Sequence, residues 1–472
     1  MTNRDDDTRK SVLLFNSPIV KHKRDQLEMG NLYPRIGIAS IASTLLRNGV
    51  EVGIVDPEIE DLPDIINRIH KFKPDIVGIP AYTEEIHDAA YTSATIKKID
   101  GEILTVIGGP HSSAIPIETL KEFDSFDIAV MGEGELTMLD IVLKKNIADV
   151  AGIAYRDNGQ IKCTEKRPVI SNLDALPYPA WELFDIEKYR GGNILSGFSG
   201  KGKSLEIPVE SARGCPYKCI FCYRVNGREI RFKSPKRTVD EVEKCVTEFN
   251  ATKIHFVEGT FGVNKKNAIE MCDELIRRGL NKKITWSSGG RVNVLDRKLL
   301  MKMKESGCEY LGFGVESGDQ AILDKIGKGI TIAQIIKVFE LCKDVGIKTE
   351  ANFIIGHPDD TEETVLKTIK FAKKLNTDHV TFAILVPFPG TKVTEMAEDN
   401  VNGLKIVTKD WRLYGKQLGY ALELEDLPYK KLVKLQTKAY REFYFRPSKL
   451  LGFVSRLSLK RVIYVIKRVA GY

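Results

Sequence analysis

Two successive series of strand-like and helix-like segments fill most of this 472-residue chain. In the first series, amphipathic stretches alternate with apolar runs at residues 11–15, 50–56, 74–82, 102–109 and 126–132. In the second series, the apolar runs lie at residues 205–211, 253–259, 283–290, 308–318, 347–356 and 378–388. Nearly continuous apolar strands that alternate with helices are typical of parallel sheets covered by helices. We therefore expect an α/β protein with a doubly wound, Rossmann-like parallel sheet first and a partial (β/α)6 barrel second.

The segments around the two series set the expected domain boundaries. Residues 150–163 are predicted to form a hairpin that turns at Asp157-Asn158-Gly159 and completes an amino-terminal domain over residues 1–164. The next stretch, residues 165–204, is rich in Pro, Gly and Ser and is predicted to be a linker. We expect the barrel over residues 205–395 and a basic, helical carboxy-terminal region over residues 396–472.

The composition excludes several classes of protein. The chain has 43% hydrophobic and 29% charged residues, which is ordinary for a globular protein. The amino terminus, MTNRDDDTRK, has no signal-peptide pattern, and no run of 18 apolar residues predicts a transmembrane helix. A secreted disulfide scaffold would be smaller and denser in cysteine, so we expect the reducing cytoplasm. Five cysteines stand singly, at positions 163, 245, 272, 308 and 342.

The other three cysteines, Cys215, Cys219 and Cys222, lie together as C-x3-C-x2-C just after the first strand-like run of the second series. A structural zinc site needs four ligands, and no histidine occurs between His111 and His255. Three thiolates suffice for a 4Fe-4S cluster that keeps one iron open for another ligand. The spacing therefore favours such a cluster over a zinc site or a chance arrangement.

The triad and its surroundings resemble the radical S-adenosylmethionine (SAM) family over residues 205–391. The resemblance implies that Cys215, Cys219 and Cys222 hold the cluster. It also implies that the open iron chelates SAM and that reduction of the cluster cleaves SAM to a 5′-deoxyadenosyl radical. Phe221 matches the aromatic position that usually packs beside adenine.

Further matches at the ends of predicted strands imply contacts with SAM. Glu258 in FVEG matches the position that holds the SAM amino group, and Arg291 in GGRVN is a candidate partner for its carboxylate. In VESG, Glu316 matches the residue that bonds the ribose hydroxyls, with Ser317 beside it. The alternative is that these residues are surface or paired charges. Two further stretches resemble family signatures: PFPGT (387–391), and NFIIGHPD (352–359), which departs from G-x-I-x-G-x-x-E by having Asn352 and Asp359.

The order of the two domains resembles cobalamin-binding members of the family. The echoes are residues 33–56, IGGPH (107–111) and MGEGE (131–135). Glycine-rich turns at strand ends let the backbone approach a bulky ligand. The resemblance makes these residues candidate cobalamin contacts: Gly37, Gly108, Gly109, Gly132, Glu133 and Gly134.

Two features bear on the cobalamin prediction. No D-x-H-x-x-G motif supplies a lower cobalt ligand, although members of this family commonly lack it too. No G-x-G-x-x-G follows the first strand, which argues against a dinucleotide site. A domain that only caps the barrel, without any corrin, stays the alternative.

The carboxy-terminal tail carries the basicity of the chain. Residues 430–472 hold twelve Lys or Arg and one acid, whereas the whole chain has a net charge of +7. Basic residues beside apolar ones suit either a helical cap on the barrel or a helix at an anionic membrane surface. These residues argue against a nucleic-acid partner, because no RNA-binding motif accompanies the charge.

The leading hypothesis is a cobalamin-dependent radical SAM enzyme that methylates an unactivated carbon of a small-molecule or lipid-like substrate. Its resemblance implies an electron donor such as a reductase with flavodoxin or ferredoxin. One alternative is radical cyclisation or oxidative rearrangement with the same cofactors. The other is a non-catalytic iron–sulfur redox or binding protein.

Overall fold

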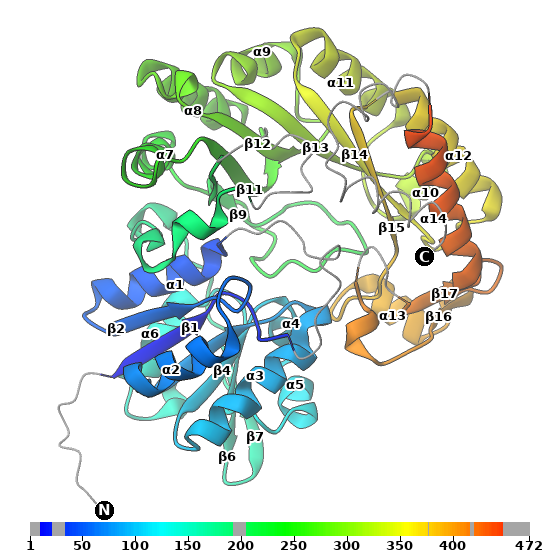
Figure 1. The fold of residues 1–472 in the computed structure, drawn as a ribbon. Coiled ribbons are helices and arrows are strands. Elements are labelled where there is room, and N and C mark those ends of the chain that lie inside the picture. The colour runs from blue at the N-terminus through cyan, green and yellow to red at the C-terminus, as the bar shows by residue number, and fades with distance from the viewer. Residues whose placement is uncertain (1–9, 21–33, 192–203, 376, 416–419, 447–472) are drawn as a thin grey trace, which may run out of the picture. The chain divides into compact units, whose positions relative to one another are not determined.

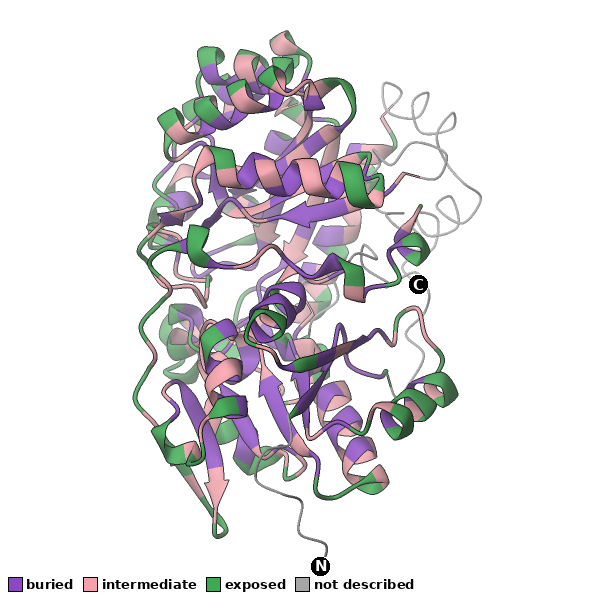
Figure 2. Ribbon diagram, turned by 90° about the vertical axis from the view of Figure 1, so that its left-hand side faces the viewer, coloured by how far each residue is buried: buried purple, intermediate pink, exposed green. Residues whose placement is uncertain are grey.

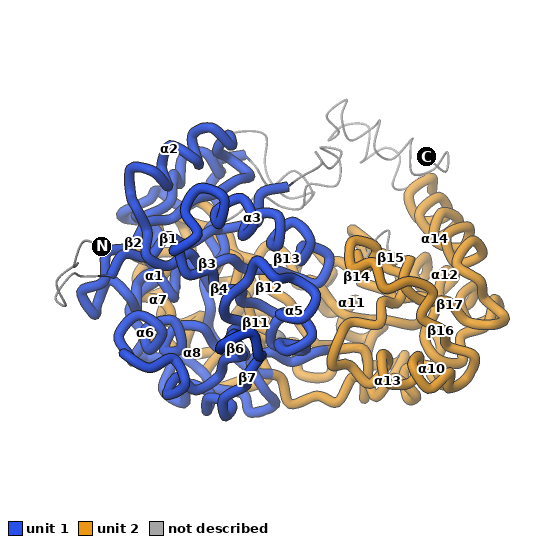
Figure 3. The backbone as a smooth tube through the Cα atoms, turned by 90° about the horizontal axis from the view of Figure 1, so that it is seen from below, with its two compact units in different colours: residues 1–214, 223–233, 247–251 blue, residues 215–222, 234–246, 252–472 orange. Residues whose placement is uncertain are grey.

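The structure is a computed structural model that describes residues 10–20, 34–191, 204–375, 377–415 and 420–446. Its contacts divide the chain into two compact units (Figure 3). The first unit comprises residues 1–214, 223–233 and 247–251, and the second comprises residues 215–222, 234–246 and 252–472. The stretch 205–214, which we expected to begin the barrel domain, therefore clusters with the first unit.

The first unit contains a seven-stranded sheet with the order β2-β1-β3-β4-β5-β6-β7 (Figure 1). Its parallel strands are β1 (Ser11–Phe15), β2 (Glu51–Val55), β3 (Ile76–Pro80), β4 (Leu104–Gly108) and β5 (Ile128–Val130). The strands are almost wholly apolar because helices cover both faces of a doubly wound sheet. The strand order reverses between β1 and β3, and ligands of such sheets bind at the carboxyl ends of the strands beside that point.

Helices follow the parallel strands of the first unit, as the alternation predicted. They are α1 (Ile36–Arg47), α2 (Leu62–Phe72), α3 (Ile86–Ile99), α4 (Pro110–Ala114), α5 (Pro116–Glu122) and α6 (Glu135–Leu143). The predicted hairpin is confirmed as β6 (Ile153–Asp157) and β7 (Gln160–Cys163). It extends the sheet, because β6 pairs antiparallel with β5 and β7 pairs antiparallel with β6. Asn158 and Gly159 both have positive φ, 48° and 79°, the backbone that a tight hairpin turn requires.

The predicted linker contributes to the core of the first unit over residues 165–191. This segment has three short 3-10 turns, at Leu173–Ala175, Trp181–Leu183 and Ile186–Tyr189. The Trp181 and Tyr189 side chains are buried, and Ala180 N donates to Ala39 O of α1 at 3.0 Å. Proline and glycine thus mark an irregular but packed segment here, and residues 192–203 lie outside the described part of the chain.

The second series forms a six-stranded sheet with the order β15-β14-β13-β12-β11-β8. Its strands are β8 (Glu206–Val209), β11 (Lys253–Phe261), β12 (Thr285–Gly290), β13 (Cys308–Glu316), β14 (Lys348–Ile355) and β15 (His379–Ile384). The pairs from β11 to β15 are all parallel. All six strands match the apolar runs, which confirms the partial parallel barrel.

Helices on the outer side of this sheet include α7 (Pro235–Phe249), α8 (Lys265–Arg277), α9 (Arg297–Glu305), α10 (Gln320–Lys325), α11 (Ile332–Val345) and α12 (Glu362–Leu375). Burial alternates along β14, where every second residue is buried, and Figure 2 shows that the strands are largely buried. Helix ends follow local chemistry: Thr331 and Gln334 form a capping box at the start of α11, and Gly346, with φ of 75°, ends it.

The last described elements are α13 (Lys392–Glu398), the antiparallel pair β16 (Leu404–Ile406) and β17 (Leu422–Leu424), and α14 (Tyr429–Tyr444). The helix α14 packs against the edge strand β15, where Tyr440 Oη accepts from Phe382 N at 3.0 Å and Tyr444 Oη accepts from Val380 N at 3.2 Å. The first part of the basic tail is therefore a cap on the sheet, and residues 447–472 lie outside the described residues.

Candidate functional site

The three clustered cysteines lie on one loop at the start of the second unit. Cys219 is buried, Cys215 is half-buried and Cys222 is exposed, and none of the three forms a disulfide bond. Backbone hydrogen bonds hold the middle of the loop, because Ile220 N donates to Ile326 O at 3.1 Å and Ile220 O accepts from Val393 N at 3.2 Å. The loop is thus fixed between the end of α10 and the start of α13.

The PFPGT signature has a structural role in this arrangement. Thr391 caps α13, since its Oγ1 accepts from Thr394 N at 3.3 Å, and the helix begins at the next residue. That cap places Val393 N, one of the first amides of the helix, where it donates to the cysteine loop. On the other side Gly327, with φ of 66°, lies so close to the loop that an added Cβ would be 3.0 Å from Lys218 O.

The remaining cysteines of the second unit lie in a different environment from the three cysteines of the loop. Cys245, Cys272, Cys308 and Cys342 are buried in its core. Burial raises the pKa of Cys272 and of Cys342 to about 12, and it raises the pKa of Cys308 well above the ordinary value. Such thiols stay protonated and behave as small apolar side chains. Among the described residues, no group of three or more His, Cys, Asp or Glu is arranged to hold a metal ion, so the fit to a cluster rests on the donor set.

Arg291 lies beside this loop, directly after β12. Its guanidinium covers the Tyr217 ring, with Cζ 3.6 Å from the ring centroid, and Nε donates to Asn293 Oδ1 at 3.0 Å. The residue is 7% exposed, and within the described part of the chain its buried Nη2 has no hydrogen-bond partner. A buried guanidinium nitrogen without an acceptor is suited to a carboxylate ligand, which fits the predicted role.

Glu316 ends β13 with the unusual φ of 66°. Its carboxylate accepts from Lys328 Nζ at 2.7 Å, and both side chains are more than 90% buried. Sequence reasoning did not find Lys328, whose only signal was its place between Gly327 and Gly329. The neighbouring Ser317 hydroxyl bonds within the protein, to Thr368 Oγ1 at 3.2 Å and from Asp319 N at 3.1 Å.

His357 follows β14 and is completely buried. Its ring lies 5.7 Å from the Phe221 ring, centroid to centroid, and neither of its ring nitrogens has a hydrogen-bond partner among the described residues. Burial, together with the charge of Lys328, lowers the pKa of His357 to about 3. The structure therefore shows a neutral ring packed beside the cysteine loop.

The turn after β14 contains Asp359, which departs from the family pattern G-x-I-x-G-x-x-E. Asp359 pairs with Lys325 at 2.9 Å, whereas the next residue, Asp360, closes the turn. Asp360 Oδ2 accepts from Gly356 N and from His357 N, both at 3.0 Å. Burial raises the pKa of Asp360 to about 6. The last predicted SAM residue, Glu258, lies on β11 towards its carboxyl end and is half-buried.

The predicted cobalamin residues gather at the carboxyl edge of the first unit's sheet. Around Gly37, Gly108 and Gly132 an added Cβ would meet nothing within 4 Å, so these glycines border open space. At Gly109 a Cβ would be 2.6 Å from Ala81 O, and at Gly134 it would be 2.7 Å from Ile41 Cδ1. The first three glycines therefore fit a cradle for a large ligand, Gly109 is required by its contact with the Ala81 backbone, and a side chain at Gly134 would have to displace the Ile41 side chain.

Glu133 differs from these glycines because its carboxylate is engaged inside the first unit. It accepts from Ile170 N at 2.7 Å and pairs with Arg231 Nη2 at 2.8 Å, and its side chain is 4% exposed. A contact between this side chain and cobalamin stays a prediction.

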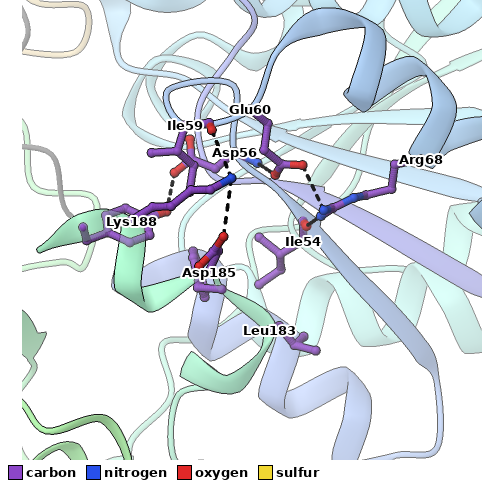
Figure 4. A pocket seen from close by; sticks show the side chains of 10 residues that line it. Ile54, Asp56, Ile59, Glu60, Arg68, Leu183, Asp185 and Lys188 are labelled. Carbon is purple, nitrogen blue, oxygen red and sulfur yellow. Dashed lines mark hydrogen bonds and ion pairs between the residues drawn. The ribbon is translucent and has the colours of Figure 1, made fainter.

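A separate small pocket of about 200 Å³ lies at the end of β2 (Figure 4). Its charged groups already have partners: Arg68 Nη2 pairs with Glu60 at 2.9 Å, and Lys188 Nζ pairs with Asp185 at 3.4 Å. It is not lined by any of the predicted site residues.

Comparison with known proteins supports this assignment of the two units. Residues 209–372 match the radical SAM superfamily, and residues 27–142 match the B12 binding domain. An uncharacterized methyltransferase of Pyrococcus horikoshii is 36% identical, with 93% of this chain and 95% of that protein covered. The chain belongs to the cobalamin-binding radical SAM family. Its cofactors are a 4Fe-4S cluster, SAM and cobalamin.

Other members of the family differ in the reaction that their names state. The anaerobic magnesium-protoporphyrin IX monomethyl ester cyclase of Rubrivivax gelatinosus is 34% identical, over 79% of this chain and 68% of that enzyme. The hopanoid C-3 methylase of Methylococcus capsulatus is 24% identical, over 86% of this chain and 76% of that enzyme. Among solved structures, the fold is similar to that of the methyltransferase TsrM of Kitasatospora setae, with a TM-score of 0.71, 17% identity, and 93% and 92% of the two chains covered.

Residues 447–472 aside, the described helices include none that is long and apolar enough to cross a membrane.

Proposed function

We propose that this radical SAM enzyme is a cobalamin-dependent methyltransferase that acts on an unactivated carbon of a small-molecule or lipid-like substrate. The observation that carries the proposal is the loop with three cysteines that form no disulfide bond, beside the buried Nη2 of Arg291, which has no hydrogen-bond partner among the described residues. Methylation is favoured over cyclisation because the relative that covers nearly the whole chain is named a methyltransferase.

When bound, the cluster, SAM and cobalamin supply the one-electron and methyl-transfer chemistry. The protein's part is to hold and orient them. Cys215, Cys219 and Cys222 are the candidate cluster ligands, and Arg291 is the candidate partner of the SAM carboxylate. Gly37, Gly108 and Gly132 border the space where the corrinoid is expected.

Other side chains are expected to exclude water from the surroundings of the cysteine loop. Phe221, Tyr217 and the neutral His357 present ring faces around the cysteine loop. The buried Glu316–Lys328 pair leaves no net charge, and Glu316 stays a candidate for the ribose hydroxyls through its second carboxylate oxygen.

The proposal is tested by anaerobic reconstitution with iron, sulfide, cobalamin, SAM and dithionite. We expect an iron content near four per chain, a corrin absorbance spectrum and formation of 5′-deoxyadenosine. Single Cys→Ala variants at positions 215, 219 and 222 are expected to lose the cluster and 5′-deoxyadenosine formation. Cys163→Ala, at an exposed thiol of the first unit, is the control and is expected to behave as the unmodified protein.

Intact cluster and 5′-deoxyadenosine in the triple Cys→Ala variant would contradict the proposal. With a substrate in hand, the product mass separates the reactions, because methylation adds one CH2 and cyclisation removes two hydrogens.

A further inference from the structure

The cysteine loop leaves and re-enters the first unit through a short pair of strands, β9 (Ala212–Arg213) and β10 (Arg231–Phe232). In Figure 3 the chain passes to the second unit at residue 215 and returns at residue 223. Gly214 continues this base, since its φ is 90° and an added Cβ would be only 2.0 Å from Glu229 O. The two stems of the loop are therefore pressed together at their base.

Two buried positive charges face each other at this base. Arg213 and Arg231 are direct antiparallel partners, and their side chains are 7% and 5% exposed. Two like charges placed opposite each other in a strand pair destabilise it, and burial increases the cost. Something must neutralise both arginines for the stems to close.

Two glutamates of the MGEGE segment supply the opposite charge. Glu135 Oε1 accepts from Arg213 Nη2 at 2.6 Å. Glu133 pairs with Arg231 Nη2 at 2.8 Å and lies 3.4 Å from Arg213 Nη1. Both carboxylates are 4% exposed, and Ser40 Oγ of α1 donates to Glu135 at 2.8 Å.

Other donors of the two arginines also have partners, whereas Arg231 Nε has none among the described residues. Arg213 Nε donates to Glu210 at 2.8 Å, and Arg231 donates to Asn226 O at 3.0 Å from within the returning stem. Burial would raise the pKa of Glu135, but the charge of Arg213 and the hydrogen bonds from Arg213 and Ser40 together outweigh it and hold that pKa below the ordinary value.

We propose that Glu133 and Glu135 are positioning residues: they hold Arg213 and Arg231 together, close the base of the loop and so fix where its three cysteines present their sulfurs. The inference rests on the proposed function, because it assumes that the loop carries the cluster. It gives MGEGE a role that does not require contact with cobalamin. A segment of the B12-binding region thereby acts on the geometry of the cluster.

The variant that tests this is Glu135→Gln, which keeps the shape of the side chain and removes its charge. Asp140→Asn is the matched control, because Asp140 lies on the same helix, α6, and pairs with Arg167 rather than with either stem arginine. Glu135 is preferred to Glu133, which is also a candidate cobalamin contact. Both variants are reconstituted with the cluster and cobalamin, as the full chain.

The readouts are the rate of iron release to a chelator and the electron paramagnetic resonance spectrum of the reduced cluster with and without SAM. We expect Glu135→Gln to release iron about tenfold faster than the unmodified protein, as for lost outer partners of metal ligands. We expect that a higher concentration of SAM is needed to change the spectrum of this variant and that its cobalamin absorbance is retained. The rate of iron release from Asp140→Asn is expected to stay within about twofold of that from the unmodified protein, because the partly exposed pair of Asp140 with Arg167 involves neither stem arginine.

Charge and geometry are separated by two substitutions of the same arginine. Arg213→Lys keeps the charge but not the forked donors, and it is expected to lie between the unmodified protein and Arg213→Met. A uniform loss of thermal stability without any change in iron release or spectrum would mean a purely structural role and would overturn the inference.

If Glu135→Gln does not fold, the double variant Glu135→Leu/Arg213→Met takes its place, because it leaves neither charge buried alone. Failure of the unmodified protein to hold a cluster counts against the proposed function. A cluster equally stable in Glu135→Gln and Asp140→Asn counts against the positioning role alone.

Discussion

At the scale of single residues, the sequence and the structure agree best where the chemistry is unusual. Three thiols within eight residues stand out from five single cysteines, and the structure places the three on one loop while four of the five are buried. By contrast, Asp360 and Lys328 have nothing unusual in sequence. Their roles come from burial beside His357 and Glu316.

The turn after β14 predicts two opposing effects of pH on stability. The pKa of Asp360 is raised to about 6 by burial, so its contribution is present below pH 3.8 and is lost as pH rises through 6. The pKa of His357 is lowered to about 3, so its contribution is present above pH 6.5 and is lost as pH falls through 3.

Single variants should therefore shift the stability profile in opposite directions. Asp360→Asn is expected to gain stability relative to the unmodified protein as pH rises from 4 to 7, by on the order of 3 kcal/mol. His357→Phe is expected to lose stability relative to the unmodified protein as pH rises from 4 to 6.5, because it lacks the gain that the lowered pKa of His357 gives in that range. Urea unfolding followed by circular dichroism at several pH values measures both, and parallel profiles for all three proteins would contradict the assignment.

At the scale of elements, α14 shows how a basic segment can serve the fold. Edge strands expose unpaired backbone groups, and proteins protect them with covering elements. Here side chains of α14 satisfy both groups of two β15 residues: Tyr444 Oη bonds Val380 N and O, and Gln436 donates to Phe382 O at 2.7 Å. The lysines of the helix are largely on its exposed side.

Removing the two hydroxyls should weaken this cap. Tyr440→Phe/Tyr444→Phe is expected to lower the free energy of unfolding by about 1–3 kcal/mol, because hydrogen bonds to the edge strand are lost while the rings keep packing. Lys430→Gln, at an exposed position of the same helix, is the control. A change no larger than that of the control, measured by urea unfolding, would argue that water replaces the hydroxyls without cost.

At the scale of the whole molecule, the position of α14 changes how the tail should be tested. A test of membrane contact designed from the sequence alone would remove the whole basic tail from residue 430. The structure shows that such a deletion would also strip the cap from β15. The segment left for contact with lipid is residues 447–472, which hold six Lys or Arg after Arg446 and no acid.

We predict that the protein binds anionic liposomes through residues 447–472. Deleting them is expected to abolish co-sedimentation with phosphatidylserine vesicles, because each basic residue near such a surface contributes about 1 kcal/mol. The deletion should leave the melting temperature of the rest unchanged. Equal sedimentation of the two proteins at low salt would refute the prediction.

The sequence by itself determined the two parallel sheets, the order of the domains and the cysteine loop, because apolar periodicity and cysteine spacing are local properties of the chain. It did not reveal that residues 165–191 pack as core, since Pro and Gly report only that a segment is irregular. Nor did it show that Glu133 and Glu135 meet Arg213 and Arg231. Those contacts join segments about 80 to 100 residues apart, and only the folded backbone, which brings the end of β5 to the base of the cysteine loop, decides them.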